Sequence, residues 1–202
     1  MRDNRVLLRR YSMGQPNVRE RLVEASLDVF QSLGFNGSSV QDLTDAAGVP
    51  KGSFYNHFAG KEDLALAALA LYIERSGVEV LRDKRLQPIE RLKRHFRTNW
   101  KTAKDRGYKA GCYLGTMSSE IADTHEKSRE AFLGVFRAWT GLIAEAIGEA
   151  QAKGDIAQAG DPALLARFVL NAWQGTLVRM KVVRSEEPLK DFNTLVFDVL
   201  LK

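Results

Sequence analysis

Apolar residues recur at helical spacing along most of this chain, and the strict alternation typical of strands is scarce. Apolar side chains three and four positions apart fall on one face of a helix. The pattern therefore predicts an all-α fold made of successive amphipathic helices. The first helix is expected to start at Asn17, whose side chain can form a capping box with Glu20, and to end at Gly34.

Two short helices joined by a tight turn are predicted next. Ser39 can cap the first of them, with Asp42 answering in a capping-box arrangement, so this helix starts near Val40. Gly48 stands where a left-handed residue would end it. Pro50 is expected to be the first residue of a new helix. Proline is tolerated there because the first backbone N–H groups of a helix have no partner within the helix. So short a connection makes the helices cross sharply, which is a way of placing one small helix in a groove of DNA.

Further helices follow this pair. A fourth is expected to begin near Gly60 and to continue into a basic stretch, and a fifth to open at Pro88 and end near Gly107. A short helix is predicted over residues 113–121. The segment from Pro188 is short and apolar, and helix is favoured over strand there.

Two long helices with wide apolar stripes are predicted between these last two segments. The first would be capped by Thr124 and stopped by Gly154, and the second would start at Asp161-Pro162. Stripes of this width contact more than one neighbour. They either fill a core within one chain or also pair with the same helices of a second chain in a four-helix interface.

Charge is distributed unevenly along the chain. The net charge of +5 alone points only weakly to a polyanionic partner. Residues 1–21 carry six arginines against two acids, residues 75–109 carry twelve Lys and Arg against four acids, and residues 110–202 carry ten against twelve. Residues 1–16 have little periodicity, so we expect a flexible basic arm that either enters a minor groove or adds nonspecific attraction to DNA.

The basic stretch over residues 75–109 lies beyond the predicted DNA-reading pair. Arg94, Arg97, Lys101 and Lys104 recur there at helical spacing. A solvated helical face is the first interpretation, and contact with a negatively charged effector is the second.

Cys112 is the one cysteine in the sequence. A single cysteine excludes an intrachain disulfide and fits a reducing compartment. No signal-peptide core and no apolar run of membrane-spanning length is evident. We therefore expect a cytoplasmic protein without a membrane partner, and nothing in the sequence indicates a cofactor or a metal.

Residues 38–64 carry a long ordered motif, which is Leu43, Ala46-Ala47-Gly48-Val49, Lys51-Gly52-Ser53-Phe54-Tyr55-Asn56-His57-Phe58 and Lys61-Glu62-Asp63-Leu64. Together these residues resemble the signature of the TetR family of bacterial transcriptional repressors. The resemblance implies a three-helix helix-turn-helix DNA-binding domain, here residues 17–60, and a larger helical domain for effector binding and dimerisation, here residues 61–202. It also implies a homodimer, whose paired helices would meet successive major grooves of a palindromic operator in double-stranded DNA.

Eight residues are candidate DNA contacts. Polar side chains on the second motif helix would meet phosphates and base edges, and Gly52 lets the backbone approach a phosphate. Ser39 and Lys61 are expected to clamp the DNA backbone from helix starts. Phe54 and Phe58 are expected to face the core instead. The candidates are Ser39, Lys51, Gly52, Ser53, Tyr55, Asn56, His57 and Lys61.

Cys112 is the second candidate site. Glycines on both sides keep the backbone open, and Lys109 with a nearby helix start would favour the reactive thiolate. From the residues alone, an inert small core residue is the alternative. We expect Cys112 at or beside an effector pocket, with large side chains as possible lining: Trp100, Met117, Phe136, Trp139 and Trp173.

A second resemblance bears on Cys112. The matching positions are Gly111-Cys112-x-Leu-Gly, Glu120, Trp173-x-Gly, and Pro188-Leu189 with Phe192. They are similar to a TetR subgroup that includes the repressor of N-ethylmaleimide reductase and acrylate-responsive repressors. The resemblance implies a cysteine that senses reactive electrophiles or oxidants. Thr116-Met117-Ser118 departs from the pattern of that subgroup, which leaves the effector open.

The expected mechanism couples the effector to the DNA. An effector that favours one arrangement of the fourth helix would change the distance between the DNA-binding domains of the two subunits and weaken DNA binding. An enzyme is the rival class, but His57, His95 and His125 are dispersed, and Cys112 could pair with a histidine only if folding brought them together. A nucleoid-type binder without effector would explain the basic first half but not the apolar second half.

Overall fold

The computed structural model describes residues 17–156 and 160–202, and the basic arm expected over residues 1–16 lies outside them. Within the described residues the chain is helical and contains no strand, which confirms the all-α class. The helices are α1 (Val18–Leu33), α2 (Val40–Ala47), α3 (Lys51–Phe54), α4 (Lys61–Arg75), the 3-10 helix η1 (Val78–Arg82), α5 (Pro88–Asp105), α6 (Tyr113–Ile121), α7 (Glu126–Lys153), α8 (Pro162–Val183), α9 (Glu187–Thr194) and the π-helix η2 (Leu195–Leu200).

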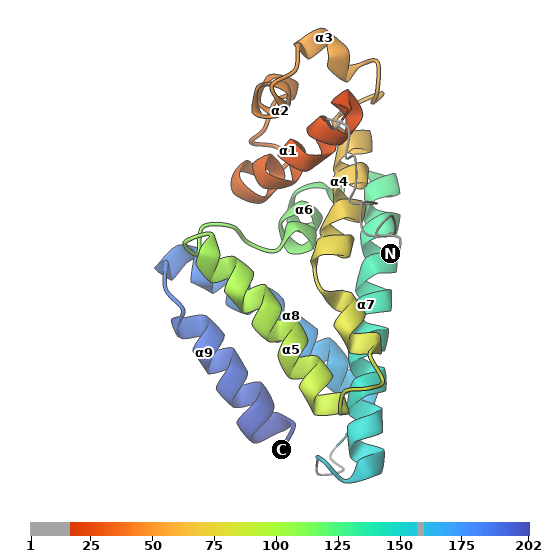
Figure 1. Ribbon diagram of the computed structural model, residues 1–202, viewed down its shortest axis with the longest axis vertical. Coiled ribbons are helices and arrows are strands. Elements are labelled where there is room, and N and C mark those ends of the chain that lie inside the picture. The colour runs from red at the N-terminus through yellow and green to blue at the C-terminus, as the bar shows by residue number, and fades with distance from the viewer. Residues whose placement is uncertain (1–16, 157–159) are drawn as a thin grey trace, which may run out of the picture.

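Helices α1–α3 form a small unit at one end of the elongated molecule, and α4 leads from it into the larger helical unit (Figure 1). Both capping boxes expected from the sequence are present, one between Asn17 and Glu20 and the other between Ser39 and Asp42. Gly48 ends α2 in the left-handed conformation, with φ 62°. These local signals therefore predicted the starts of α1 and α2 and the turn after α2.

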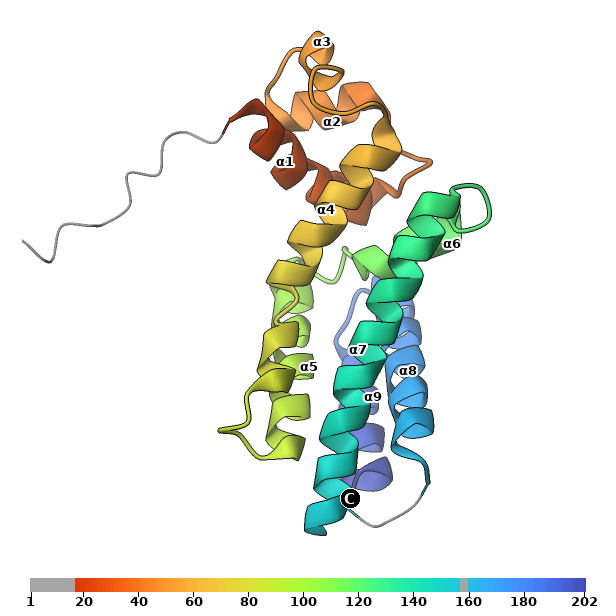
Figure 2. The ribbon, with the colours of Figure 1, turned by 90° about the vertical axis from the view of Figure 1, so that its right-hand side faces the viewer.

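The larger unit is built around α7, which packs against α8, α5, α6 and η1 (Figure 2). Its buried side chains Ile143, Ala146 and Ile147 form a continuous core with Trp173 of α8 and Phe96 of α5. By length and composition α7 could cross a membrane, contrary to the sequence prediction that no run approaches such a length. Of its most apolar stretch, 33% is buried inside the protein.

Three helix boundaries differ from the sequence predictions. The fourth helix ends at Arg75, and the left-handed Gly77, with φ 67°, separates it from η1. Pro50 is the cap residue of α3 rather than its first residue. His125 stands before α7 in place of Thr124, whose hydroxyl lies 2.8 Å from His125 Nδ1. A hydroxyl engaged with the neighbouring ring is not free to cap the helix.

Exposed apolar side chains distinguish α8 and the C-terminal segment from α7. The sequence pattern had assigned the outer apolar faces to both long helices. In the structure α7 is covered on several sides, and the large exposed apolar side chains of this unit lie on α8 and η2: Leu164, Phe168, Val178, Val182, Val183, Leu195 and Val199. A surface of this kind is typical of a protein–protein interface.

Candidate functional site

The surface formed by α2 and α3 carries the candidate DNA contacts. Phe54 is fully buried and Phe58 is 5% exposed, as expected from the sequence, and their rings pack together. Tyr55 between them is 61% exposed. The candidates exposed to solvent on this surface are Ser39, Lys51, Gly52, Tyr55, Asn56 and His57, and Ser53 is half-buried.

Helix α3 is shorter than the sequence pattern indicated. It ends at Phe54, so Tyr55, Asn56 and His57 follow the helix in a turn. The amides of His57 and Phe58 both donate to the Phe54 carbonyl at 3.0 Å, which holds this turn against the helix end. One turn of helix and the turn after it therefore present the polar side chains together.

Helix α1 supports this surface from below. Arg21 Nη2 donates to the carbonyls of Ala47 and Gly48, at 2.8 and 2.7 Å, and so satisfies acceptors at the end of α2. The Arg19 guanidinium lies 5.3 Å from the centre of the Phe58 ring. These contacts fix the small unit through side chains that a helix-turn-helix motif alone does not identify.

Lys61 has a different position from the one expected. Its Nζ donates to the carbonyls of Phe35 and Ser38, at 2.5 and 2.7 Å, and lies 4.1 Å from the centre of the Phe35 ring. Burial lowers the Lys61 pKa, and the nearby Glu120 opposes this shift. The ammonium thus ties the α1–α2 loop to the start of α4 instead of extending as a free phosphate clamp.

Cys112 lies at the junction between the two units. It stands at the cap position of α6, is 6% exposed, and its Sγ lies 3.1 Å from the hydroxyl of Tyr72 on α4. Burial, and then the contact with Cys112, raises the Tyr72 pKa well above its usual value, so the phenol keeps its proton and can donate to the sulfur. Tyr72, rather than Lys109 or a histidine, is the polar side chain at this sulfur.

The segment before Cys112 is docked on α1. Arg106 donates to Asp28 at 2.7 Å and also to Gln31, whose amide in turn donates to the Gly111 carbonyl at 3.4 Å. Tyr113, next to the cysteine, donates to the Ala65 carbonyl of α4 at 2.7 Å. The cysteine therefore belongs to a loop that touches both α1 and α4.

The far end of α6 also contacts the DNA-facing unit. Glu120 accepts a hydrogen bond from the Asn36 amide at 2.7 Å, and its carboxylate packs against Gly34, where any side chain would collide with it. Gly34 and Asn36 lie in the loop between α1 and α2. Helix α6 therefore contacts the α1–α2 loop of the small unit at its C-terminal end and carries Cys112 at its N-terminal end.

The five residues predicted to line a pocket with Cys112 are dispersed. Trp173 borders a small cavity of about 50 Å³ beside Cys112 and Tyr72. Met117 is fully buried, and Trp100 is half-buried. Phe136 borders a hollow between α7 and α8, and Trp139 borders another cavity. A second cleft at Cys112, of about 240 Å³, has a polar lining that the sequence did not identify: Thr116, Ser119, Gln174 and Lys181.

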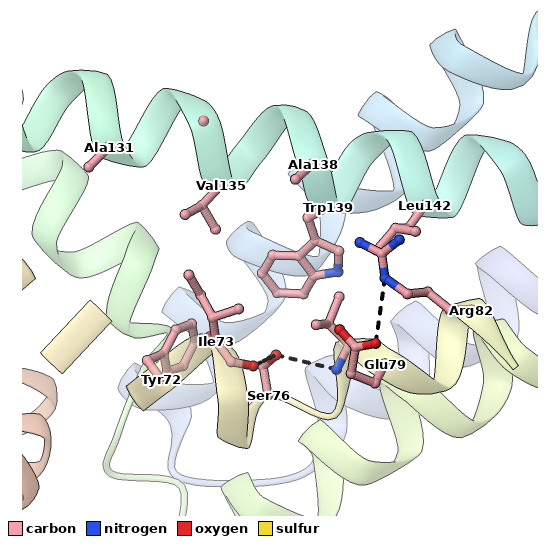
Figure 3. A pocket seen from close by; sticks show the side chains of 12 residues that line it. Tyr72, Ile73, Ser76, Glu79, Arg82, Ala131, Val135, Ala138, Trp139 and Leu142 are labelled. Atoms are coloured by element: carbon pink, nitrogen blue, oxygen red, sulfur yellow. Dashed lines mark hydrogen bonds and ion pairs between the residues drawn. The ribbon is translucent and has the colours of Figure 1, made fainter. Parts of the chain in front are cut away.

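The cavity that contains Trp139 lies between α4, η1 and α7 (Figure 3). Its volume is about 280 Å³. Tyr72 and Ile73 face it from α4, and the Trp139 indole projects into it from α7. Because Tyr72 borders both this cavity and the Cys112 site, one side chain of α4 connects the two.

Sequence reasoning missed Tyr72 and the role of His95. His95 is fully buried, and its Nε2 accepts the indole proton of Trp139 at 3.0 Å while its Nδ1 lies 3.4 Å from the Gly77 carbonyl. Burial lowers the His95 pKa to about 4. The helical spacing of the apolar residues around both positions was a signal for burial, but their partners are distant in sequence.

The basic stretch over residues 75–109 is largely paired with acids. Arg75 contacts Glu24 on α1 at 2.5 Å, and the fully buried Arg91 contacts Glu149 on α7. Arg97 and Lys101 are exposed on α5, as a solvated face requires. Among the described residues no group of His, Cys, Asp and Glu could hold a metal ion.

Comparison with known proteins extends these observations. Residues 22–68 match the family of bacterial regulatory proteins described as tetR, and residues 88–196 match the tetracyclin repressor-like C-terminal domain. The repressor DhaR of Mycobacterium sp. (strain GP1) is 38% identical over 94% of this chain and 95% of its own length. The regulator AcuR of Cereibacter sphaeroides is 31% identical over 86% of this chain and 80% of its own.

Solved structures agree in fold. A regulatory protein TetR from Rhodobacter sphaeroides superimposes with a TM-score of 0.81 at 30% identity, covering 87% of this chain and 95% of that one. The reduced form of Escherichia coli NemR gives a TM-score of 0.77 at 26% identity, covering 90% of this chain and 97% of that one. With a helix-turn-helix unit, a matching C-terminal domain and relatives along almost its whole length, the chain belongs to the TetR family of transcriptional regulators.

Proposed function

We propose that this TetR-family repressor binds a palindromic operator as a homodimer and is released when an electrophile or oxidant reacts at Cys112. The observation that supports release at this residue is its position, with its sulfur 3.1 Å from Tyr72 of α4 and its loop on α1. A group added to this sulfur changes the atom that Tyr72 contacts. Any part of the group that does not fit in the adjoining cleft of about 240 Å³ has to displace neighbouring side chains. The protein would act in the cytoplasm, where the DNA is.

DNA reading is assigned to the exposed polar residues of α3 and the turn after it. Lys51 and the exposed Tyr55 and His57 would meet phosphates or base edges, with Asn56 and Ser53 beside them. Ser39 would meet the DNA backbone at the start of α2. Two copies about 34–36 Å apart would read successive major grooves, which requires a dimer.

The dimer is assigned to the exposed apolar surface of α8 and η2. Burying Leu164 and Phe168, which are 57% and 58% exposed, against the same residues of a second copy would form an isologous interface. Leu164→Glu should therefore produce monomers in sedimentation measurements. Leu33→Glu is the matched control, because Leu33 is 53% exposed on α1 and should leave the dimer intact. Equal sedimentation of the Leu164→Glu variant and the unaltered protein would contradict this assignment.

The chemistry at Cys112 can be written as an addition. The thiol adds across a carbon–carbon double bond activated by a carbonyl, so that a sulfur–carbon bond forms at one carbon and the thiol proton ends on the other. Nothing beyond the thiol and the electrophile is consumed. The added group would break the contact with Tyr72 and push α4, or the loop before α6, away from its present position.

The test begins with footprinting on the DNA that flanks the protein's own gene, where a protected palindrome is expected. Absence of protection with an intact dimer would overturn specific repression, and binding with steep salt dependence but little sequence preference would indicate a nucleoid-type protein instead. N-ethylmaleimide should then release the protected DNA from the unaltered protein. Cys112→Ser should keep its operator affinity and lose this release. Unchanged release would show that Cys112 is an inert core residue.

A further inference from the structure

The cavity between α4, η1 and α7 has features of a binding site separate from Cys112. Three of the residues by which α7 lines it are small: Ala131, Gly134 and Ala138. Ala131 and Ala138 lie across the cavity from the side of α4 that carries Ile73 (Figure 3). Ala131, Gly134 and Ala138 follow helical spacing along one face of α7, so the space beside the larger side chains of α7 is only partly filled. The remaining walls are mainly aliphatic, with the rings of Tyr72 and Trp139.

The polar groups at the wall are already paired with protein atoms. The Trp139 indole donates to His95 at 3.0 Å, and the Ser76 hydroxyl donates to the Ile73 carbonyl at 2.7 Å. Glu79 and Arg82 at the rim pair with each other at 3.5 Å. A charged ligand would lose its hydration here without gaining an unpaired partner, so the site favours uncharged molecules.

Size and shape narrow the ligand further. A cavity of about 150 Å³ lined by aliphatic and aromatic side chains holds benzene. The volume here is about 280 Å³, which suits a molecule about the size of two fused aromatic rings. The indole of Trp139 and the ring of Tyr72 offer surfaces on which such a molecule can pack.

We propose that this cavity binds an uncharged, bicyclic aromatic molecule without a covalent bond and independently of Cys112. A ligand here would touch Trp139, and Trp139 is connected through His95 to Gly77, which lies between the end of α4 and η1. Under the proposed function the protein would thus accept two kinds of effector, one by reaction at Cys112 and one by fit beside Trp139.

The experiment uses the full chain labelled with 5-fluorotryptophan, without DNA, and naphthalene as the probe. Fluorine NMR separates Trp100, Trp139 and Trp173, with assignments from single Trp→Phe variants. Naphthalene should shift the Trp139 resonance with saturation, and naphthalene-2-sulfonate should bind about tenfold more weakly because of its charge. A saturable shift at Trp100 or Trp173 instead of Trp139 would overturn the proposal, as would equal affinity for the sulfonate.

Two matched substitutions on α7 locate the site. Ala138→Leu fills the cavity and should weaken naphthalene binding about tenfold or more, whereas Ala152→Leu makes the same change at an exposed position outside it. Circular dichroism melting curves confirm that both variants fold. Equal binding by the two variants would contradict the site. Cys112→Ser should bind naphthalene as the unaltered protein does. The Cys112→Ser variant distinguishes the two proposals. If Cys112 does not sense electrophiles, naphthalene should still shift the Trp139 resonance.

Discussion

The two ends of α4 differ in how they are held. At the end near the DNA-facing unit, Lys61 donates to two carbonyls, Glu62 accepts from Ser128, and Asp63 pairs with Lys127 at 2.8 Å. At the other end, Tyr72 and Ile73 border an apolar cavity, and the helix stops before the left-handed Gly77. The end near the DNA-facing unit is thus held mainly by polar contacts, whereas the other end combines the Arg75–Glu24 ion pair with an apolar cavity. Under the proposed function, α4 would respond to an effector at this second end.

The largest expected effect concerns the cavity end and its buried histidine. Burial lowers the His95 pKa from about 6.5 to about 4, so the unfolded chain takes up the proton first as pH falls. The stabilisation is complete above pH 6.5 and is lost as pH falls toward 4. With about 1.4 kcal/mol per pKa unit, the free energy of unfolding should fall by about 3 kcal/mol over this window.

Urea unfolding at several pH values measures this dependence. Carboxylates titrate in the same range, so the informative quantity is the difference from His95→Gln, which cannot take up this proton. The variant should be less stable at pH 7 and should lose less on acidification. Parallel stability curves for the two proteins would show that His95 does not titrate on unfolding.

The second effect tests the polar end of α4. Lys61→Met removes two hydrogen bonds from an ammonium to the carbonyls of Phe35 and Ser38. Loss of charged hydrogen bonds at a half-buried position should lower the free energy of unfolding by about 1–2 kcal/mol. The measurement is urea unfolding at neutral pH.

Lys51→Met is the matched control for Lys61→Met. Lys51 is exposed at the start of α3, so the same substitution should leave the unfolding free energy nearly unchanged and weaken operator binding, with a smaller salt dependence. If Lys61→Met left stability intact and weakened DNA binding as Lys51→Met does, Lys61 would be a DNA contact as the sequence first indicated.

The contrast between the two ends also explains how much the sequence could predict. Caps and turns are local: Asn17, Ser39 and Gly48 each act within a few residues, and all three were predicted correctly. Tyr72 and Cys112 are forty positions apart, and no periodicity indicates that they meet. Trp139 was correctly placed on an apolar face of α7, but the pattern could not show that this face turns toward η1 rather than Cys112.

A third effect concerns Gly77, the left-handed residue that separates α4 from η1. Gly77 has φ 67°, and a Cβ there would lie 3.4 Å from Thr98 Cγ2. Gly77→Ala should lower the free energy of unfolding by about 1–2 kcal/mol through left-handed strain. Gly134→Ala is the control, because that glycine lies within a helix with open space around it and the change should stabilise by about 0.5–1 kcal/mol. Changes of the same sign in the two variants would contradict a special conformation at Gly77.

The smallest expected change in stability belongs to a substitution at Tyr72, which distinguishes the Cys112 site from the cavity beside Trp139. Tyr72→Phe removes the hydroxyl beside the Cys112 sulfur and keeps the ring that borders the cavity. Because a thiol is a weak hydrogen-bonding partner, stability should change by less than about 1 kcal/mol. The rate of reaction of Cys112 with N-ethylmaleimide should change, while naphthalene should shift the Trp139 resonance as before.

Tyr113→Phe controls for the loss of a phenol hydroxyl, because Tyr113 donates to the Ala65 carbonyl and its hydroxyl does not contact the sulfur. It should react with N-ethylmaleimide at the rate of the unaltered protein. If Tyr72→Phe changed naphthalene binding and left the thiol's reaction rate untouched, the hydroxyl would serve the cavity and not the cysteine. Tyr72 would then belong to the cavity beside Trp139 and not to the reactive site at Cys112.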